Sequence, residues 1–141
     1  MTSWLFHIYD VRRTSEPSQT RESSLKFMTC SLACMTDGKG YAIGFVEGRI
    51  GLQYFDPSPE VQHQKYAFKC HRQTIEDIDH MWPVNSLAFH LVHNTFASAG
   101  SDGTVSIWDH KLKKRLHQYP KYSPPIASVH STATAPVWQL R

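Results

Sequence analysis

Apolar and polar residues alternate with a period of two along most of the chain. Successive side chains of a β-strand point to opposite faces, so this alternation predicts antiparallel strands with one apolar face. A helical period is barely visible, and only residues 73–79 are faintly helical. The alternating stretches are residues 5–9, 41–46, 49–54, 66–68, 84–89, 95–98 and 104–108. The sequence therefore predicts an all-β fold.

Two of these stretches belong to an internal repeat. The run from Gly48 to Leu52 aligns with the run from Gly103 to Ile107, and the end of the second run matches an earlier one that contains Ile8. The positions Ile8, Leu52 and Ile107 are 44 and 55 residues apart. This spacing is typical of a four-stranded propeller blade of about 40 to 45 residues. We expect the extra length to be an insertion between residues 71 and 84, and residues 13–24 to form a loop between blades.

Composition favours a folded protein and gives no sign of a surface for nucleic acid or a membrane. Of the 141 residues 40% are hydrophobic, which is enough for a packed core, and the net charge of +3 does not indicate direct binding to nucleic acid. The basic run at residues 111–115 is expected in a solvated turn. No apolar run is long enough to span a membrane, and no secretory signal is visible. The three cysteines, predicted to be structural thiols of a reducing compartment, are Cys30, Cys34 and Cys70.

Residues 100–109 resemble the signature of a WD repeat, which ends here in Trp108 and Asp109. A further series of motifs closely resembles the mitotic spindle-checkpoint propellers that escort the Bub kinases to kinetochores. That series comprises residues 21–27, 47–49, 56–62, 65–72, 83–85 and 93–97. The resemblance implies a truncated equivalent of a seven-bladed WD-repeat propeller, with about three four-stranded blades and a ring that is not closed. We expect residues 1–128 to form this partial propeller and residues 129–141 to form an irregular tail.

The resemblance also implies a function. Propellers of this family bind a short segment called the GLEBS motif, whose glutamates meet arginines, and the matching positions here are Arg49 and Arg72. An arginine guanidinium suits this task because it donates two parallel hydrogen bonds to a carboxylate and stays charged. The expected protein is a non-enzymatic scaffold in the nucleus and at the kinetochore. Its expected partner is a checkpoint kinase or, in the related mRNA-export propellers, a nucleoporin.

Four residues resemble the hydrogen-bonded tetrad that ties a WD blade together: His71, Ser98, Asp102 and Trp108. Serine, histidine and aspartate could also suggest a hydrolase. No nucleophile elbow accompanies them, so the structural role is the better prediction. The nine histidines lack the spacing of metal ligands, and we expect no metal and no cofactor.

A third possibility is a product that does not bind at all, because an open ring exposes sheet edges and apolar faces.

Overall fold

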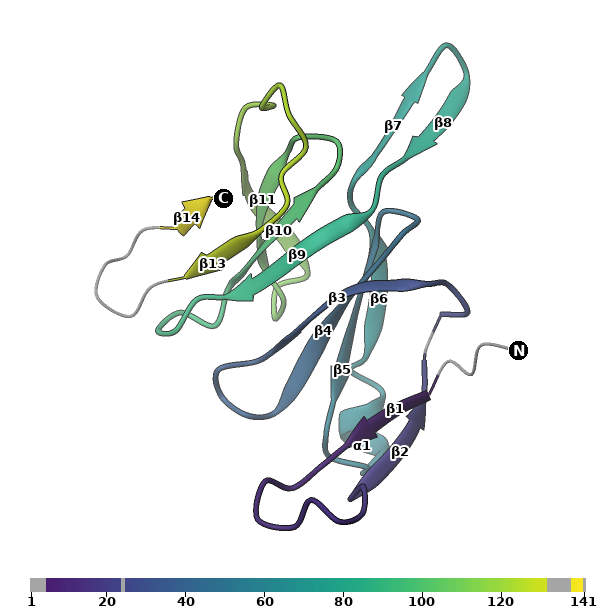
Figure 1. The fold of residues 1–141 in the computed structure, drawn as a ribbon, viewed down its shortest axis with the longest axis vertical. Coiled ribbons are helices and arrows are strands. Elements are labelled where there is room, and N and C mark those ends of the chain that lie inside the picture. The colour runs from purple at the N-terminus through teal and green to yellow at the C-terminus, as the bar shows by residue number, and fades with distance from the viewer. Residues whose placement is uncertain (1–4, 24, 132–137, 141) are drawn as a thin grey trace.

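The computed structural model describes residues 5–23, 25–131 and 138–140. Two four-stranded antiparallel sheets form its centre (Figure 1). The first sheet contains β3 (Thr29–Cys34), β4 (Gly40–Phe45), β5 (Arg49–Tyr54) and β6 (Tyr66–Lys69). The second contains β9 (Val84–Phe89), β10 (Phe96–Gly100), β11 (Val105–Asp109) and β12 (Lys114–Gln118). In both sheets neighbours along the chain pair in order, as in a propeller blade.

Three strand pairs and one short helix complete the described part. β1 (Leu5–Ile8) pairs with β2 (Gln19–Glu22), and β13 (Val129–Ser131) pairs with β14 (Trp138–Leu140). Helix α1 (Pro59–Gln62) follows the first three strands of the first sheet. The third pair, β7 (Arg72–Ile75) and β8 (Ile78–Met81), is a hairpin that follows the first sheet and precedes the second along the chain. It occupies the predicted insertion and projects away from the sheets in Figure 1.

The main core lies between the two sheets. Ile50 and Leu52 of β5 belong to the same buried cluster as Leu87 and Phe89 of β9. All six residues of β4 and all five of β10 are buried, because each of these strands is covered on both faces. The buried members of this core are Met35, Ala42, Ile50, Leu52, Val84, Leu87, Phe89, Phe96 and Trp108.

A smaller apolar cluster lies on the outer face of each sheet. On the first sheet the β1–β2 pair packs Phe6 and Ile8 onto Tyr41, Ile43 and Phe45 of β4. On the second sheet β13 packs against a cluster that includes Val105 and Ile107. The buried members of that cluster are Ala97, Ala99, Val105, Ile107, Ile126 and Val129. Neighbouring sheets thus cover one another, so the prediction of an all-β, partial, open propeller is confirmed.

The faintly helical interpretation of residues 73–79 is wrong, because this segment forms the β7–β8 hairpin. Glu76 and Asp77 both have positive φ, at 50° and 61°, which is the backbone of a tight two-residue hairpin turn. Thr74 and Asp79 face each other in register and are joined by a side-chain hydrogen bond of 2.6 Å. Cross-strand pairing here outweighs the weak helical pattern.

The loop predicted at residues 13–24 contains strand β2. Its sequence is polar, but Arg21 holds it against the first sheet by donating to the backbone oxygens of Tyr54 and Phe55. The basic run at residues 111–115 does include a turn after Asp109, which caps the backbone N–H of Lys111 at 2.9 Å. However, its last two residues begin β12, which is exposed along its whole length.

The segment expected to be an irregular tail contains both strands of the β13–β14 pair. Val129 is buried, with 3% of its surface exposed. Its backbone N–H donates a hydrogen bond to the Ser86 hydroxyl at 3.1 Å. Residues 129–131 and 138–140 thus differ from the expectation. Residues 132–137 and 141 lie outside the described residues, and a domain boundary at residue 128 stays a prediction.

Candidate functional site: an arginine pair beside a blade-tying relay

The turn between β4 and β5 approaches the start of the β7–β8 hairpin very closely. Gly48 has a φ of +61°, and a Cβ built on it would lie 2.4 Å from the backbone oxygen of His71. The Gly48 oxygen also accepts a 2.9 Å hydrogen bond from the backbone N–H of Cys70. Only glycine fits this close approach in a left-handed conformation. The turn therefore brings the segment around Arg49 next to the segment around Arg72.

Arg72 is tied to this turn. Its Nε donates to the Glu47 backbone oxygen at 2.8 Å, and its Nη2 lies 3.7 Å from the Glu47 carboxylate. The side chain is 17% exposed. The short bond to the carbonyl orients the guanidinium, while the longer charge contact leaves its terminal N–H groups weakly engaged.

Arg49 lies on the other side of the same turn and has a polar atom without a partner. Its guanidinium stands over the Phe27 ring, 5.7 Å from the ring centre. The Nε atom is buried and makes no hydrogen bond within the described residues. A buried, unsatisfied donor costs about 1 to 3 kcal/mol, so an incoming acceptor would be favoured here. The structure thus brings Arg49 and Arg72 to one turn, and neither is fully buried.

The four residues of the predicted tetrad form one continuous hydrogen-bonded relay. The Trp108 Nε1 donates to the Ser98 hydroxyl at 2.8 Å, and that hydroxyl lies 3.0 Å from the His71 Nε2. The His71 Nδ1 lies 2.9 Å from one Asp102 oxygen. One direction satisfies every donor: tryptophan to serine, serine to histidine and histidine to aspartate. The relay joins the corner after β6 to three places on the second sheet.

Thr104 completes the relay, although sequence reasoning did not single it out. Its hydroxyl donates to Asp102 at 2.8 Å and its backbone N–H donates to the same carboxylate at 3.0 Å. The signal was present in the sequence, because the side chain of an aspartate in a turn commonly accepts a hydrogen bond from the backbone N–H two residues later. The lack of a side chain at Gly100 makes room for the relay, since a Cβ there would lie 2.5 Å from the His71 ring.

Asp102 makes folding sensitive to acid. Burial acts to raise the pKa of Asp102, but the hydrogen bonds from His71 and Thr104 and the attraction of His71 outweigh it, so the pKa lies below its usual value. A carboxyl group whose pKa is lower in the folded state stabilises the fold above its unfolded pKa, near 4, and loses this contribution as the pH falls through the folded pKa.

We therefore expect Asp102→Asn to flatten the acid limb of the stability curve. The measurement is the free energy of unfolding by urea at several pH values between about 5 and 2. The parent protein should lose stability more steeply over this range than the variant. Asp77→Asn, in the exposed hairpin turn, is the control and should keep the parent's slope. Parallel curves for the parent and Asp102→Asn would contradict the assignment.

The serine, histidine and aspartate of the relay are connected as in a hydrolase triad, but a substrate cannot reach the serine. Ser98 is fully buried, and 2% of the His71 surface is exposed. The Ser98 oxygen already accepts the Trp108 N–H, so its hydroxyl serves packing between strands. A nucleophile must reach a substrate carbonyl, and this one is sealed in the blade.

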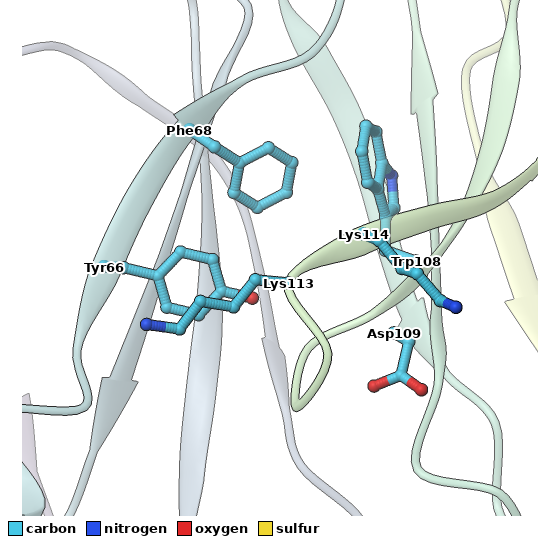
Figure 2. A pocket seen from close by; sticks show the side chains of 6 residues that line it. All are labelled: Tyr66, Phe68, Trp108, Asp109, Lys113 and Lys114. Atoms are coloured by element: carbon cyan, nitrogen blue, oxygen red, sulfur yellow. The ribbon is translucent and has the colours of Figure 1, made fainter.

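A cleft of about 210 Å³ opens where the outer strands of the two sheets meet. Figure 2 shows Phe68 of β6 facing Trp108 of β11, with ring centres 4.7 Å apart, and Lys113 lying across Tyr66. Burial raises the pKa of Tyr66 to about 12, and its hydroxyl donates to the His110 oxygen at 2.9 Å. The cleft is lined by Tyr66, Phe68, Trp108, Asp109, Lys113 and Lys114. Nothing in the sequence indicated this cleft, because its shape depends on the packing of the two sheets.

Within the described ranges, no three histidine, cysteine, aspartate or glutamate side chains gather as they would around a metal ion. Helix α1, which the structure describes, is far too short to cross a bilayer, and no other helix of the described part qualifies. The three cysteines are free thiols.

The sheet architecture and the relay define the class of protein: this is a segment of a WD-repeat β-propeller. The solved structure of U3-55K superposes on 92% of this chain with a TM-score of 0.71 and 16% identity, and the chain covers 37% of it. The crystal structure of RRP9 WD40 repeats superposes on 77% with a TM-score of 0.61 and 11% identity, and 30% of that chain is covered. At such low identity these likenesses show the fold alone. No protein-family model matches the chain.

Sequence relatives show which WD-repeat proteins the chain is similar to. Mitotic checkpoint protein BUB3.1 of Arabidopsis thaliana is 50% identical over 123 residues, which are 87% of this chain and 36% of the relative. Mitotic checkpoint protein bub3 of Dictyostelium discoideum is also 50% identical, over 86% of this chain and 37% of its own length. The mRNA export factor GLE2 of Chaetomium thermophilum is 42% identical over 79% of this chain and 32% of its own length.

The chain is homologous to mitotic-checkpoint WD-repeat proteins over most of its own length and, at lower identity, to an mRNA export factor. It spans a little over a third of the length of the checkpoint relatives. The relatives carry the names of checkpoint and export proteins, in keeping with a non-enzymatic role.

Proposed function

We propose that the protein is a spindle-checkpoint scaffold that binds a GLEBS-type peptide of a checkpoint kinase through Arg49 and Arg72. The observation that carries this proposal is the buried Nε of Arg49, which has no hydrogen-bond partner and lies beside the turn that holds Arg72. A glutamate of the peptide would give this donor an acceptor. Homology to checkpoint proteins supports the choice of partner.

The two arginines would play different parts. Arg72 is already oriented by the Glu47 carbonyl, so its terminal nitrogen atoms can be shared with a second carboxylate at little cost in side-chain entropy. Arg49 is held over Phe27, which shields it from water and strengthens a charge-assisted hydrogen bond. Glu47, whose side chain is 34% exposed, would repel an acidic residue placed wrongly and so fix the register of the peptide.

The test is a binding titration of the full chain with a labelled GLEBS peptide, such as that of a Bub-type kinase. Removing one partner of a desolvated charge pair typically costs about 2 to 5 kcal/mol. Arg49→Glu and Arg72→Glu should each weaken binding by at least about tenfold, which corresponds to 1.4 kcal/mol. Arg13→Glu is the matched control, because the Arg13 side chain is 78% exposed and its nearest acid is 4.0 Å away.

Melting curves of each variant separate loss of binding from loss of fold. Binding that is unchanged in both Arg49→Glu and Arg72→Glu would refute the proposed site. A parent chain that melts cooperatively but does not bind the peptide would favour the third possibility, a chain without independent binding. Tighter binding of a nucleoporin GLEBS peptide than of the kinase peptide would favour the mRNA-export role, although the export relative has the lower identity. For the checkpoint role we expect the protein in the nucleus and at kinetochores.

A further inference from the structure

The loop between β1 and β2 carries two arginines just before an exposed serine. Arg12 and Arg13 lie three and two residues before Ser15, and no other serine or threonine of the sequence has lysine or arginine at both of these positions. Protein kinases select their substrates by such charge patterns, and an arginine-directed kinase binds the two guanidinium groups with its own carboxylates. The sequence of the loop therefore fits this class of kinase.

Ser15 is accessible in the folded chain. It is exposed, and its hydroxyl makes no hydrogen bond to another described residue. Residues 14–17 lie outside any helix or strand, just after the bridge that pairs Asp10 with Arg13. A kinase binds the segment around its target serine in an extended form, and an exposed loop can adopt that form without breaking the pairing of strands.

Both arginines can pair with a kinase at little cost. The Arg12 side chain is 86% exposed, and it contacts the Asp10 carboxylate at 2.8 Å in an ion pair that is open to water. The Arg13 side chain is 78% exposed and lies 4.0 Å from Glu16. Exposed ion pairs contribute little to stability, so exchanging these partners for carboxylates of a kinase does not require the fold to open.

Ser18, the next serine of the loop, differs from Ser15 in both respects. Its hydroxyl and its backbone N–H each donate to the Ile8 oxygen at 2.8 Å, which holds Ser18 in place just before β2. The residues three and two positions before Ser18 are Ser15 and Glu16, and neither is basic. The charge pattern and the free hydroxyl thus coincide at Ser15.

We propose that Ser15 is a phosphorylation site of an arginine-directed serine/threonine kinase. The Ser15 oxygen attacks the γ-phosphorus of ATP, an O–P bond forms, and the bond to the β-phosphate oxygen breaks, so that ADP leaves. The hydroxyl proton passes to the catalytic aspartate of the kinase. The charged side chains of residues 10–16 are two arginines and two acids, which sum to zero. The phosphate gives this loop a net charge of about −1.5 to −2 at neutral pH.

The loop and the candidate peptide site lie at opposite ends of β5. Gln19, which follows the loop, donates its side-chain amide to the Phe55 oxygen at 3.2 Å, just after β5 ends, whereas Arg49 begins β5. The loop and the β7–β8 hairpin lie at opposite ends of the molecule in Figure 1. The length of β5, about 17 Å, is about twice the Debye length of about 8 Å at physiological salt. The phosphate should therefore leave binding of the GLEBS peptide unchanged, and each site can be tested without the other.

The experiment incubates the folded full chain with MgATP and the catalytic subunit of cyclic-AMP-dependent protein kinase, which is arginine-directed. Mass spectrometry of the digested product locates the phosphate. We expect one phosphate per chain, at Ser15. Ser15→Ala should slow the incorporation of phosphate at least about tenfold. Ser18→Ala, the matched control in the same loop, should keep the parent's rate.

Arg13→Gln tests whether the charge pattern guides the kinase. The kcat/KM for phosphorylation should fall at least about tenfold, because one guanidinium that pairs with a kinase carboxylate is lost. Lys65→Gln removes an exposed positive charge elsewhere and should keep the parent's kcat/KM. A folded chain that takes up no phosphate, a phosphate found chiefly on another residue, or an equal kcat/KM for the parent and Arg13→Gln would overturn the proposal.

Discussion

Trp108→Ala is expected to lower the free energy of unfolding by about 3 to 5 kcal/mol, the usual cost of removing a large ring from a core. The indole is 9% exposed, lies 4.7 Å from the Phe68 ring and donates to Ser98. Its loss would leave a cavity between the two sheets and deprive the Ser98 oxygen of its donor. The measurement is unfolding by urea followed by circular dichroism.

Two further substitutions separate packing from hydrogen bonding at this position. Trp108→Phe keeps a ring in the core and should cost less than the alanine variant, since it loses mainly a hydrogen bond and part of the ring volume. Trp82→Ala removes a tryptophan that stacks on His80 at the base of the projecting hairpin, outside the main core. If Trp108→Ala were no more destabilising than Trp82→Ala, the two sheets would not depend on this core.

His71→Ala has the second largest expected effect, a loss of about 2 to 4 kcal/mol in the free energy of unfolding. The ring is 2% exposed and joins Asp102 to Ser98. Without it a carboxylate that is shielded from water keeps only its bonds from Thr104, and the corner after β6 is released from the second sheet. The same urea measurement applies.

His63→Ala is the control for this substitution, because His63 is an exposed residue at the end of α1. It should change the free energy of unfolding by less than about 0.5 kcal/mol, as exposed substitutions usually do. Equal effects for His71→Ala and His63→Ala would mean that the relay does not tie the blades together.

The sequence predicted the central strands well because the features that define them, apolar alternation and flanking turns, lie within each segment. β4, β5, β9, β10 and β11 carry apolar alternation that must be buried, and turns such as Glu47-Gly48 show where they end. The four tetrad residues were also found, from their likeness to a WD repeat, and the structure places them in one relay.

The outer strands were missed because pairing with a neighbouring strand defines them, and their own residues show no apolar alternation. β2 and β12 are polar and largely exposed, so nothing in their sequence separates them from loops, and only pairing with β1 and β11 makes them strands. The β7–β8 hairpin was missed for the same reason.

The state of Arg49 could not be derived from the sequence either. Its Nε is buried by the Phe27 ring and by the neighbouring strands, which come from separate parts of the chain. A charged residue beside a glycine turn is usually solvated, and only the packed structure shows an orphaned donor. Burial of a polar atom is a property of the assembled sheets.

A charge-swap titration tests the acidic-peptide site most directly. Arg49→Glu should bind the parent GLEBS peptide at least about tenfold more weakly, and a peptide in which a glutamate is replaced by arginine should recover much of that loss with this variant alone. Recovery would show that Arg49 and a peptide carboxylate meet in the complex. Equal binding of both peptides by the parent chain and by Arg49→Glu would contradict the account.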